Sequence, residues 1–326
     1  MKVTEILSNA KEPLISFEII PPQRGGDIKS LLAVIEDVAQ YKPPFIDITS
    51  HAAEIIYEET PKGIRKRVIR KRPGTLGICA LIQNKYNIEA VPHILCRNFT
   101  REETEDFLIE LSYLGIENVL AIQGDDKGFV KEIPHGRSTN IYAIDLVKQV
   151  VQMNKGKYLE EELLDAKPSN FCIGVSGYPE KHFAAPNLKT DISHTKAKID
   201  AGADYVVTQM FFDNKAYFSY VEKMREAGVT APVIPGLKIV TQKSHLTILP
   251  KNFFLNIPED LSGEILEAKP EHVLEIGVNW AAKQVEELLD NGVPSIHFYI
   301  MQYSKPIKML MNKLKLHEKK FFVTKK

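Results

Sequence analysis

The sequence predicts an α/β fold, a (β/α)₈ TIM barrel, because short apolar strands alternate with amphipathic helices along 326 residues. A glycine ends the helical pattern just before a strand at four places, Gly115, Gly202, Gly228 and Gly292. Glycine readily adopts the left-handed conformation that terminates a helix. No GxGxxG motif follows any strand, which disfavours an open dinucleotide-binding sheet.

Eight apolar segments are the expected strands, and helical periodicity fills the intervals between them. The periodicity is clearest over residues 28–38 and 107–114, and Thr100-Arg101-Glu102-Glu103 has the sequence of a capping box that opens the second of these helices. The strands are expected at residues 15–20, 45–50, 90–96, 118–124, 171–179, 205–212, 232–239 and 295–302.

We expect a single barrel domain over residues 1–326 that carries two insertions and a tail. Residues 52–89, after the second strand, contain seven Lys or Arg between Lys62 and Arg72 and are expected to be a solvated hairpin or loop. Residues 154–169, before the fifth strand, are expected to form a polar, helix-like surface insertion, and residues 306–326 a basic C-terminal tail.

Composition limits the classes of function. The 42 basic and 42 acidic residues cancel, so global charge favours neither nucleic acid nor a membrane surface as a partner. Three distant cysteines without a CxxC pair indicate reduced thiols and no metal site. Because there is no apolar run of 18 residues and no apolar segment near the N-terminus, we expect a cytoplasmic protein.

Glu18 interrupts an apolar strand, Ile15–Ile20, that Pro21-Pro22 stops. Since side chains alternate along a strand, Phe17 and Ile19 face one way while Glu18 faces the other. If both faces are covered, burial raises the pKa of Glu18 and lets it donate a proton near neutral pH. The alternative is a glutamate that pairs with a lysine or arginine at the strand end.

Polar residues lie at the ends of seven of the eight expected strands, which predicts a lined barrel mouth. The alternatives remain that His93 is a core histidine, that Tyr178 and Tyr299 are packing aromatics, and that Asp191 is a helix cap. The strand-end residues are Glu18, Thr49, His93, Gln123 with Asp125, Tyr178, Gln209 and Tyr299.

Several short motifs occur in a fixed order, and together they resemble the methylenetetrahydrofolate reductase family of the bacterial, single-domain, FAD-dependent type. The resemblance covers about residues 13–305. The motifs are Ser16-Phe17-Glu18 with Pro21-Pro22, Pro92–Cys96, Ala121–Asp125, Tyr178-Pro179-Glu180 with His182, Lys198–Ala203, Thr208–Asp213, Pro235-Gly236 and His297-Phe298-Tyr299.

The resemblance implies that FAD, bound non-covalently, passes hydride from NADH or NADPH to 5,10-methylenetetrahydrofolate by a ping-pong mechanism. The product, 5-methyltetrahydrofolate, feeds one-carbon and methionine metabolism, and relatives are often homo-oligomers. Glu18 would be the general acid that protonates a ring nitrogen of the folate. Asp125 would lie by the pyrimidine edge of the flavin, where its charge disfavours the anionic reduced flavin.

The resemblance also implies which residues hold the ligands. FAD and the nicotinamide would contact Thr49, Ser50, Ala52, His93, Gln123, Gly124, Asp125, Tyr142, Ala143, Tyr178, His182, Asp191, His194 and Lys198. Folate would contact Asp125, Gln209, Tyr299, His245 and Tyr303.

The chain departs from the family pattern in its charges. Gln123 and Ala197 replace arginines, His194 replaces an asparagine, and His245 and Tyr303 replace a glutamine and an arginine that commonly meet folate. The loss of the arginines at positions 123 and 197 favours an alternative reductase on the same barrel that uses no FAD or needs a partner subunit. A nucleic-acid-binding protein that uses the Lys62–Arg72 cluster is the non-enzymatic alternative.

Overall fold

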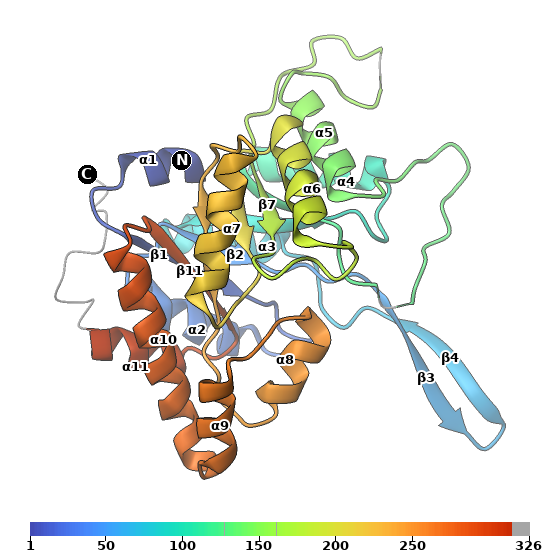
Figure 1. Ribbon diagram of the computed structural model, residues 1–326. Coiled ribbons are helices and arrows are strands. Elements are labelled where there is room, and N and C mark those ends of the chain that lie inside the picture. The colour runs from blue at the N-terminus through green and yellow to red at the C-terminus, as the bar shows by residue number, and fades with distance from the viewer. Residues whose placement is uncertain (127, 161, 315–326) are drawn as a thin grey trace.

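The computed structural model describes residues 1–126, 128–160 and 162–314, and it shows an almost closed parallel barrel (Figure 1). All eight expected strands are present, and the barrel fold is confirmed. The sheet has the order β10-β11-β1-β2-β5-β6-β7-β8-β9. Its strands are β1 Leu14–Ile19, β2 Phe45–Ile48, β5 Glu89–Leu95, β6 Asn118–Ile122, β7 Cys172–Gly177, β8 Tyr205–Thr208, β9 Val233–Ile234, β10 Gly236–Leu237 and β11 Ser295–Met301.

The expected seventh strand is divided into β9 and β10 at Pro235, and this division closes the barrel. Residues before the proline pair with β8, and residues after it pair with β11. Proline has no N–H to give to a ladder, so strand pairing is easily interrupted there. The Pro235 carbonyl still accepts a hydrogen bond of 2.9 Å from the backbone N–H of His297.

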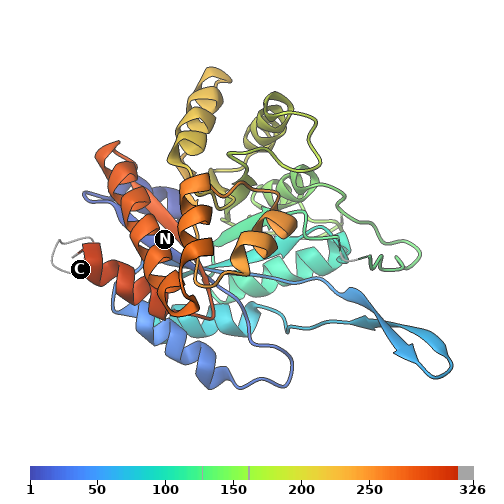
Figure 2. The same ribbon diagram turned by 60° about the horizontal axis from the view of Figure 1, so that its bottom comes forward.

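Helices cover the outside of the sheet (Figure 2). The capping box at Thr100 is confirmed, because its hydroxyl accepts a 3.1 Å bond from Glu103 N–H and its own N–H donates to the Glu103 carboxylate at 2.8 Å. The helices are α1 Val3–Asn9, α2 Ile28–Ala39, α3 Leu76–Tyr86, α4 Arg101–Tyr113, α5 Ala143–Met153, α6 Leu188–Asp200, α7 Asn214–Glu226, α8 His245–Phe253, α9 Glu259–Glu267, η1 Pro270–His272, α10 Val273–Asp290 and α11 Lys305–Leu314.

The two faces of β1 belong to different apolar clusters, as its alternation predicts. Phe17 and Ile19 pack in the large cluster between strands and helices. Leu14 lies in the smaller cluster inside the barrel, with Phe45 and Tyr205. Glu18 has the same parity as Leu14 and therefore points into the barrel.

Residues 54–69 form an antiparallel hairpin, β3 Glu54–Thr60 and β4 Gly63–Ile69, that projects from the barrel (Figure 1, Figure 2). The prediction that the whole of 52–89 is an insertion is wrong, because α3 occupies residues 76–86 and packs on the barrel. Ile78, Cys79 and Ile82 are buried and have helical spacing, but the basic residues 62–72 before them dominate the sequence pattern of this segment.

Residues 154–169 contain no helix among those that the structure describes, so the helix-like prediction is wrong. Two residues here have a left-handed backbone, Gly156 with φ +74° and Asp165 with φ +61°, and each interrupts helical geometry. Pro168 also cannot donate a helical hydrogen bond.

The expected tail also begins later than residue 306. Helix α11 includes Ile307, Leu310 and Met311, which are buried in the main core, and its partner is α10. The i, i+3, i+4 spacing of these apolar residues explains the packing. The remainder of the predicted tail, residues 315–326, lies outside the described residues.

Helix α10 approaches the segment after β10 so closely that position 277 has no room for a side chain. A Cβ atom on Gly277 would lie 1.9 Å from the carbonyl oxygen of Val240. We expect Gly277→Ala to lower the free energy of unfolding, measured in urea, by at least about 2 kcal/mol.

Gly263→Ala in α9 is the matched control, because a Cβ there meets no atom within 4 Å. It should raise stability by about 0.5–1 kcal/mol, as expected for alanine in a helix interior. Equal effects of the two substitutions would contradict the close helix approach.

Candidate functional site

Glu18 lies inside the barrel near the carboxyl end of β1, and only 5% of its surface is exposed. The hydroxyl of Thr49, just after β2, donates a 2.6 Å hydrogen bond to its Oε1 atom. The Nε2 atoms of His93 and His297 lie 3.6 and 4.0 Å from its Oε2 atom. Strands β1, β2, β5 and β11 therefore bring these side chains together, as predicted for Glu18, Thr49 and His93.

The pKa of Glu18 lies below its usual range, so the expectation of a raised pKa is wrong. Burial raises the pKa, but the charge of His93, contacts with His297 and the Thr49 hydrogen bond together outweigh it. The alternative of a lysine or arginine ion pair also fails among the described residues, because the ion-pair contacts of Glu18 are with histidines, and Lys238 interacts with it only through its charge.

Asp47 is a buried carboxylate that the sequence analysis missed. It stands on β2 directly beside Glu18 in the strand register and is fully buried. Its Oδ2 atom lies 3.5 Å from Nε2 of His93. The signal was available, because Asp47 interrupts the apolar strand Phe45–Ile48 in the same way that Glu18 interrupts its own.

Four predicted cofactor residues come together between the end of β7 and α6. The ammonium of Lys198 donates a 2.6 Å hydrogen bond to the Ser176 carbonyl, and burial lowers its pKa to about 8. Asp191 is buried and accepts a 3.1 Å bond from His182 N–H. The rings of His182 and Tyr178 meet edge to face with centroids 4.6 Å apart.

Asp191 is not the cap of α6. That position belongs to Asn187, whose side-chain oxygen accepts from Thr190 N–H at 2.9 Å. Burial raises the pKa of Asp191, although the His182 N–H and the Lys198 charge oppose this rise. A buried carboxylate thus stands beside a half-buried ammonium at this edge of the barrel.

The end of β6 lies between the Glu18 and Lys198 groups. Gln123 donates a 3.1 Å hydrogen bond to the Ile141 carbonyl, and Gly124 has a left-handed φ of +86°. The negative charge of Asp125 acts to raise the pKa of both His51 and Tyr178. Two further predicted residues begin helix α5, Tyr142 as its exposed N-cap and Ala143 as its first residue.

Another part of the mouth is built on β8, β10 and β11. The hydroxyl of Tyr299 donates a 2.6 Å bond to the Thr208 carbonyl, and Lys238 donates a 2.8 Å bond to the Tyr299 carbonyl. Burial lowers the pKa of Lys238 to about 8 although the charge of Glu18 opposes this. Lys238 was missed, yet it too follows a strand end.

Gln209 and His245 use their side chains locally in the structure. The Gln209 Oε1 atom accepts a 2.9 Å bond from Met210 N–H, directly after β8. The Nδ1 atom of His245 accepts from Thr241 N–H at 3.3 Å, and burial with the Lys238 charge lowers its pKa to about 4.

Four predicted residues remain. Tyr303 is 48% exposed after β11, and His194 is exposed on α6, where its charge reaches Asp191. Ala52 is partly buried just before the hairpin. Ser50 lines a cavity of about 320 Å³ together with His93 and with Arg70 of the hairpin.

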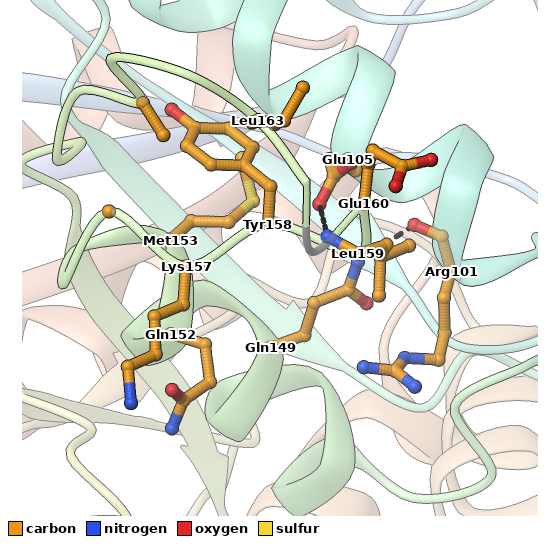
Figure 3. A pocket seen from close by; sticks show the side chains of 12 residues that line it. Arg101, Glu105, Gln149, Gln152, Met153, Lys157, Tyr158, Leu159, Glu160 and Leu163 are labelled. Atoms are coloured by element: carbon orange, nitrogen blue, oxygen red, sulfur yellow. Dashed lines mark hydrogen bonds between the residues drawn. The ribbon is translucent and has the colours of Figure 1, made fainter.

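A larger cavity of about 420 Å³ lies elsewhere and contains none of the predicted site residues (Figure 3). It is formed by α4, α5 and residues 156–160, 163 and 166, and Glu105 there accepts a 2.8 Å bond from Leu159 N–H. Cavity size therefore does not locate the chemistry, whereas the convergence of ionisable groups at strand ends does. No His, Cys, Asp and Glu cluster in the described ranges is arranged to hold a metal ion.

Comparison with known proteins gives consistent results. A family model described as methylenetetrahydrofolate reductase matches residues 2–315. Methylenetetrahydrofolate reductase 1 of Schizosaccharomyces pombe is 30% identical over 306 residues, which are 92% of this chain and 46% of that protein. The 5,10-methylenetetrahydrofolate reductase of Salmonella typhimurium is 29% identical over 290 residues, 88% of this chain and 86% of that protein.

The chain spans about half the length of the eukaryotic relatives that it matches. A solved structure, described as an uncharacterized protein from Clostridium thermocellum that binds two copies of 5-methyl-5,6,7,8-tetrahydrofolic acid, matches with a TM-score of 0.60. It is 12% identical and covers 96% of this chain and 99% of that chain, a likeness of fold. No helix within the described parts is long and apolar enough to cross a membrane.

Removal of the Thr49 hydroxyl should raise the pKa of Glu18. Thr49→Val deletes a hydrogen bond to the ionised carboxylate, so we expect the pKa to rise and neutral-pH stability to fall by about 1.5–3 kcal/mol. Carboxyl ¹³C NMR titration measures the pKa of Glu18, and urea unfolding measures the stability. Thr49→Ser keeps the donor and should behave like the parent; an equal shift in both variants would contradict the role of the hydroxyl.

Proposed function

The chain belongs to the methylenetetrahydrofolate reductase family, and on that premise we propose that it reduces 5,10-methylenetetrahydrofolate to 5-methyltetrahydrofolate with bound FAD and with NADH or NADPH as hydride donor. The observation that carries the proposal is the buried Glu18 at the barrel mouth, in contact with Thr49 and His93. A site of this kind can deliver a proton where water is excluded. We place the enzyme among cytoplasmic homo-oligomers of one-carbon and methionine metabolism.

The residues at the ends of β6 and β7 fit a flavin dinucleotide. Lys198 forms one hydrogen bond among the described residues, to Ser176, and an ammonium has three donors, so it can also neutralise a phosphate. Gly124 has no Cβ and a left-handed backbone, which allows a ligand to approach closely. His182, Asp191 and Tyr178 stand beside Lys198, and we assign this group to the FAD tail.

Bound FAD would supply hydride transfer between the nicotinamide and folate, and the protein supplies position and charge. Asp125 contributes a negative charge at the end of β6, and we assign it to the reactive edge of the flavin. The amide of Gln209 can offer a donor and an acceptor to the pterin. Tyr299, His245 and Tyr303 complete the assigned folate side, where Lys238 adds a positive charge.

Glu18 is assigned as the general acid that protonates a ring nitrogen of the folate. Its low pKa, together with a raised pKa for His93, indicates that the resting proton lies on the imidazole. Substrate binding must therefore make Glu18 more basic, or His93 must pass it a proton. Because one mouth serves both substrates in turn, we propose ping-pong kinetics.

A flavin-free reductase on the same barrel is the second candidate. It is favoured by Gln123, which stands where the family has an arginine and whose amide is held by Ile141. A flavin absorption band in the purified protein separates the two candidates.

The FAD assignment predicts the effect of removing the Lys198 charge. Loss of one charged hydrogen bond costs about 1.5–3 kcal/mol, so Lys198→Met should weaken FAD binding about 10- to 100-fold. Quenching of flavin fluorescence measures the affinity, and Lys198→Arg should retain most of it.

The control is Lys196→Met on the same helix, because Lys196 pairs with Asp200 at the surface. Its FAD affinity should match that of the parent. Tight FAD binding by Lys198→Met would remove Lys198 from the cofactor site, and no FAD binding by the parent would favour the flavin-free reductase.

Glu18→Gln keeps the size of the side chain and an acceptor for Thr49 but cannot donate the same proton. We expect flavin reduction by the nicotinamide to persist, while flavin oxidation by methylenetetrahydrofolate slows by about 10²–10⁴-fold, as for a lost general acid. Stopped-flow measurement of each half-reaction tests this. Equal losses in the two half-reactions would make Glu18 a structural residue.

A further inference from the structure

Three ionisable side chains from three neighbouring strands meet inside the barrel. Asp47, Glu18 and His93 are 0%, 5% and 4% exposed. The Nε2 atom of His93 lies 3.6 Å from the Glu18 carboxylate and 3.5 Å from the Asp47 carboxylate. One imidazole nitrogen is thus shared between two buried carboxylates.

Asp47 has no evident structural reason to be a carboxylate. Neither of its oxygens accepts a hydrogen bond from the described residues. A buried polar group without a hydrogen bond destabilises the fold, and a buried charge destabilises it more unless it is paired. The cationic form of His93 is the partner that would compensate it.

We propose that Asp47 is a positioning residue that keeps His93 protonated beside Glu18, so that His93 returns the proton that Glu18 gives to the folate ring nitrogen. The inference rests on the proposed function. In the return step the N–H bond at Nε2 breaks, an O–H bond forms at Oε2 of Glu18, and neutral His93 regains its proton from solvent. The 3.6 Å gap exceeds a hydrogen bond by about 0.4 Å, so the side chains must first move closer.

The need for a second carboxylate follows from the proton count. Glu18 must be neutral before it can donate, and a neutral Glu18 no longer compensates a buried imidazolium. Asp47 supplies that negative charge in both protonation states of Glu18. When Glu18 becomes a carboxylate again, it finds a protonated histidine next to it.

The surrounding charges agree with this assignment. Burial lowers the pKa of His93, but the charges of Glu18 and Asp47 outweigh burial and raise it above the ordinary value. Two carboxylates and one imidazolium leave one negative charge uncompensated. The ammonium of Lys238 balances this charge, because Lys238 interacts electrostatically with Glu18. Other titratable groups that face the three residues are His51, Cys79 of α3, Tyr205 of β8, and His297 and Tyr299 of β11.

Asp47→Asn tests the inference because it removes the charge and keeps the shape. His93 should lose its proton at lower pH than in the parent, which imidazole NMR titration measures without any cofactor or substrate. Flavin oxidation by methylenetetrahydrofolate should fall about 10-fold at pH 8.5 and recover towards the parent rate as the pH is lowered. Flavin reduction by the nicotinamide should change little.

Asp126→Asn is the control for losing one negative charge near the mouth. Asp126 follows β6, is exposed and pairs with Arg97, so neither the His93 titration nor the pH profile should change. An unchanged His93 titration in Asp47→Asn would overturn the inference.

If Asp47→Asn does not fold, the parent protein still decides the matter. A neutral His93 at pH 7 in the parent would refute the role of Asp47, and a protonated His93 would support it. Failure of this inference also differs from failure of the proposed function. The former leaves the folate defect of Glu18→Gln intact, whereas the latter abolishes that defect.

Discussion

The alternation of side chains along β1 places a carboxylate inside a closed barrel, and much of the site depends on that placement. Leu14 and Glu18 lie on the same face of β1. The strand therefore contributes an apolar side chain to the barrel interior near its amino end and an acid near its carboxyl end. Parallel neighbours in register then decide what surrounds the acid. Asp47 stands beside it on one side and Tyr299 on the other.

The polar interior is stable only because its charges compensate one another. Glu18 and Asp47 share the imidazole of His93, and the ammonium of Lys238, directly after β10, adds a positive charge that interacts with Glu18. An uncompensated charge at this depth would cost several kcal/mol. This balance fixes the protonation of the whole group, so a substitution at any member should change the titration of the others.

The strands and the position of Glu18 were predictable because both rest on local periodicity. The direction of its pKa was not, because that direction depends on His93 and His297, which only the closed barrel brings near. Asp47 could have been found by the same alternation that singled out Glu18. Helix α3 was not predicted, because the strongly basic hairpin before it dominates the composition of residues 52–89.

One segment, residues 235–240, takes part both in closing the barrel and in forming its mouth. Pro235 divides the pairing between β8 and β11, and three residues later Lys238 bonds to the Tyr299 carbonyl. The backbone two residues beyond, at Val240, is in close contact with Gly277 of α10. A glycine on an outer helix therefore helps to position the ammonium that balances Glu18, because a larger residue there must displace the segment that carries Lys238.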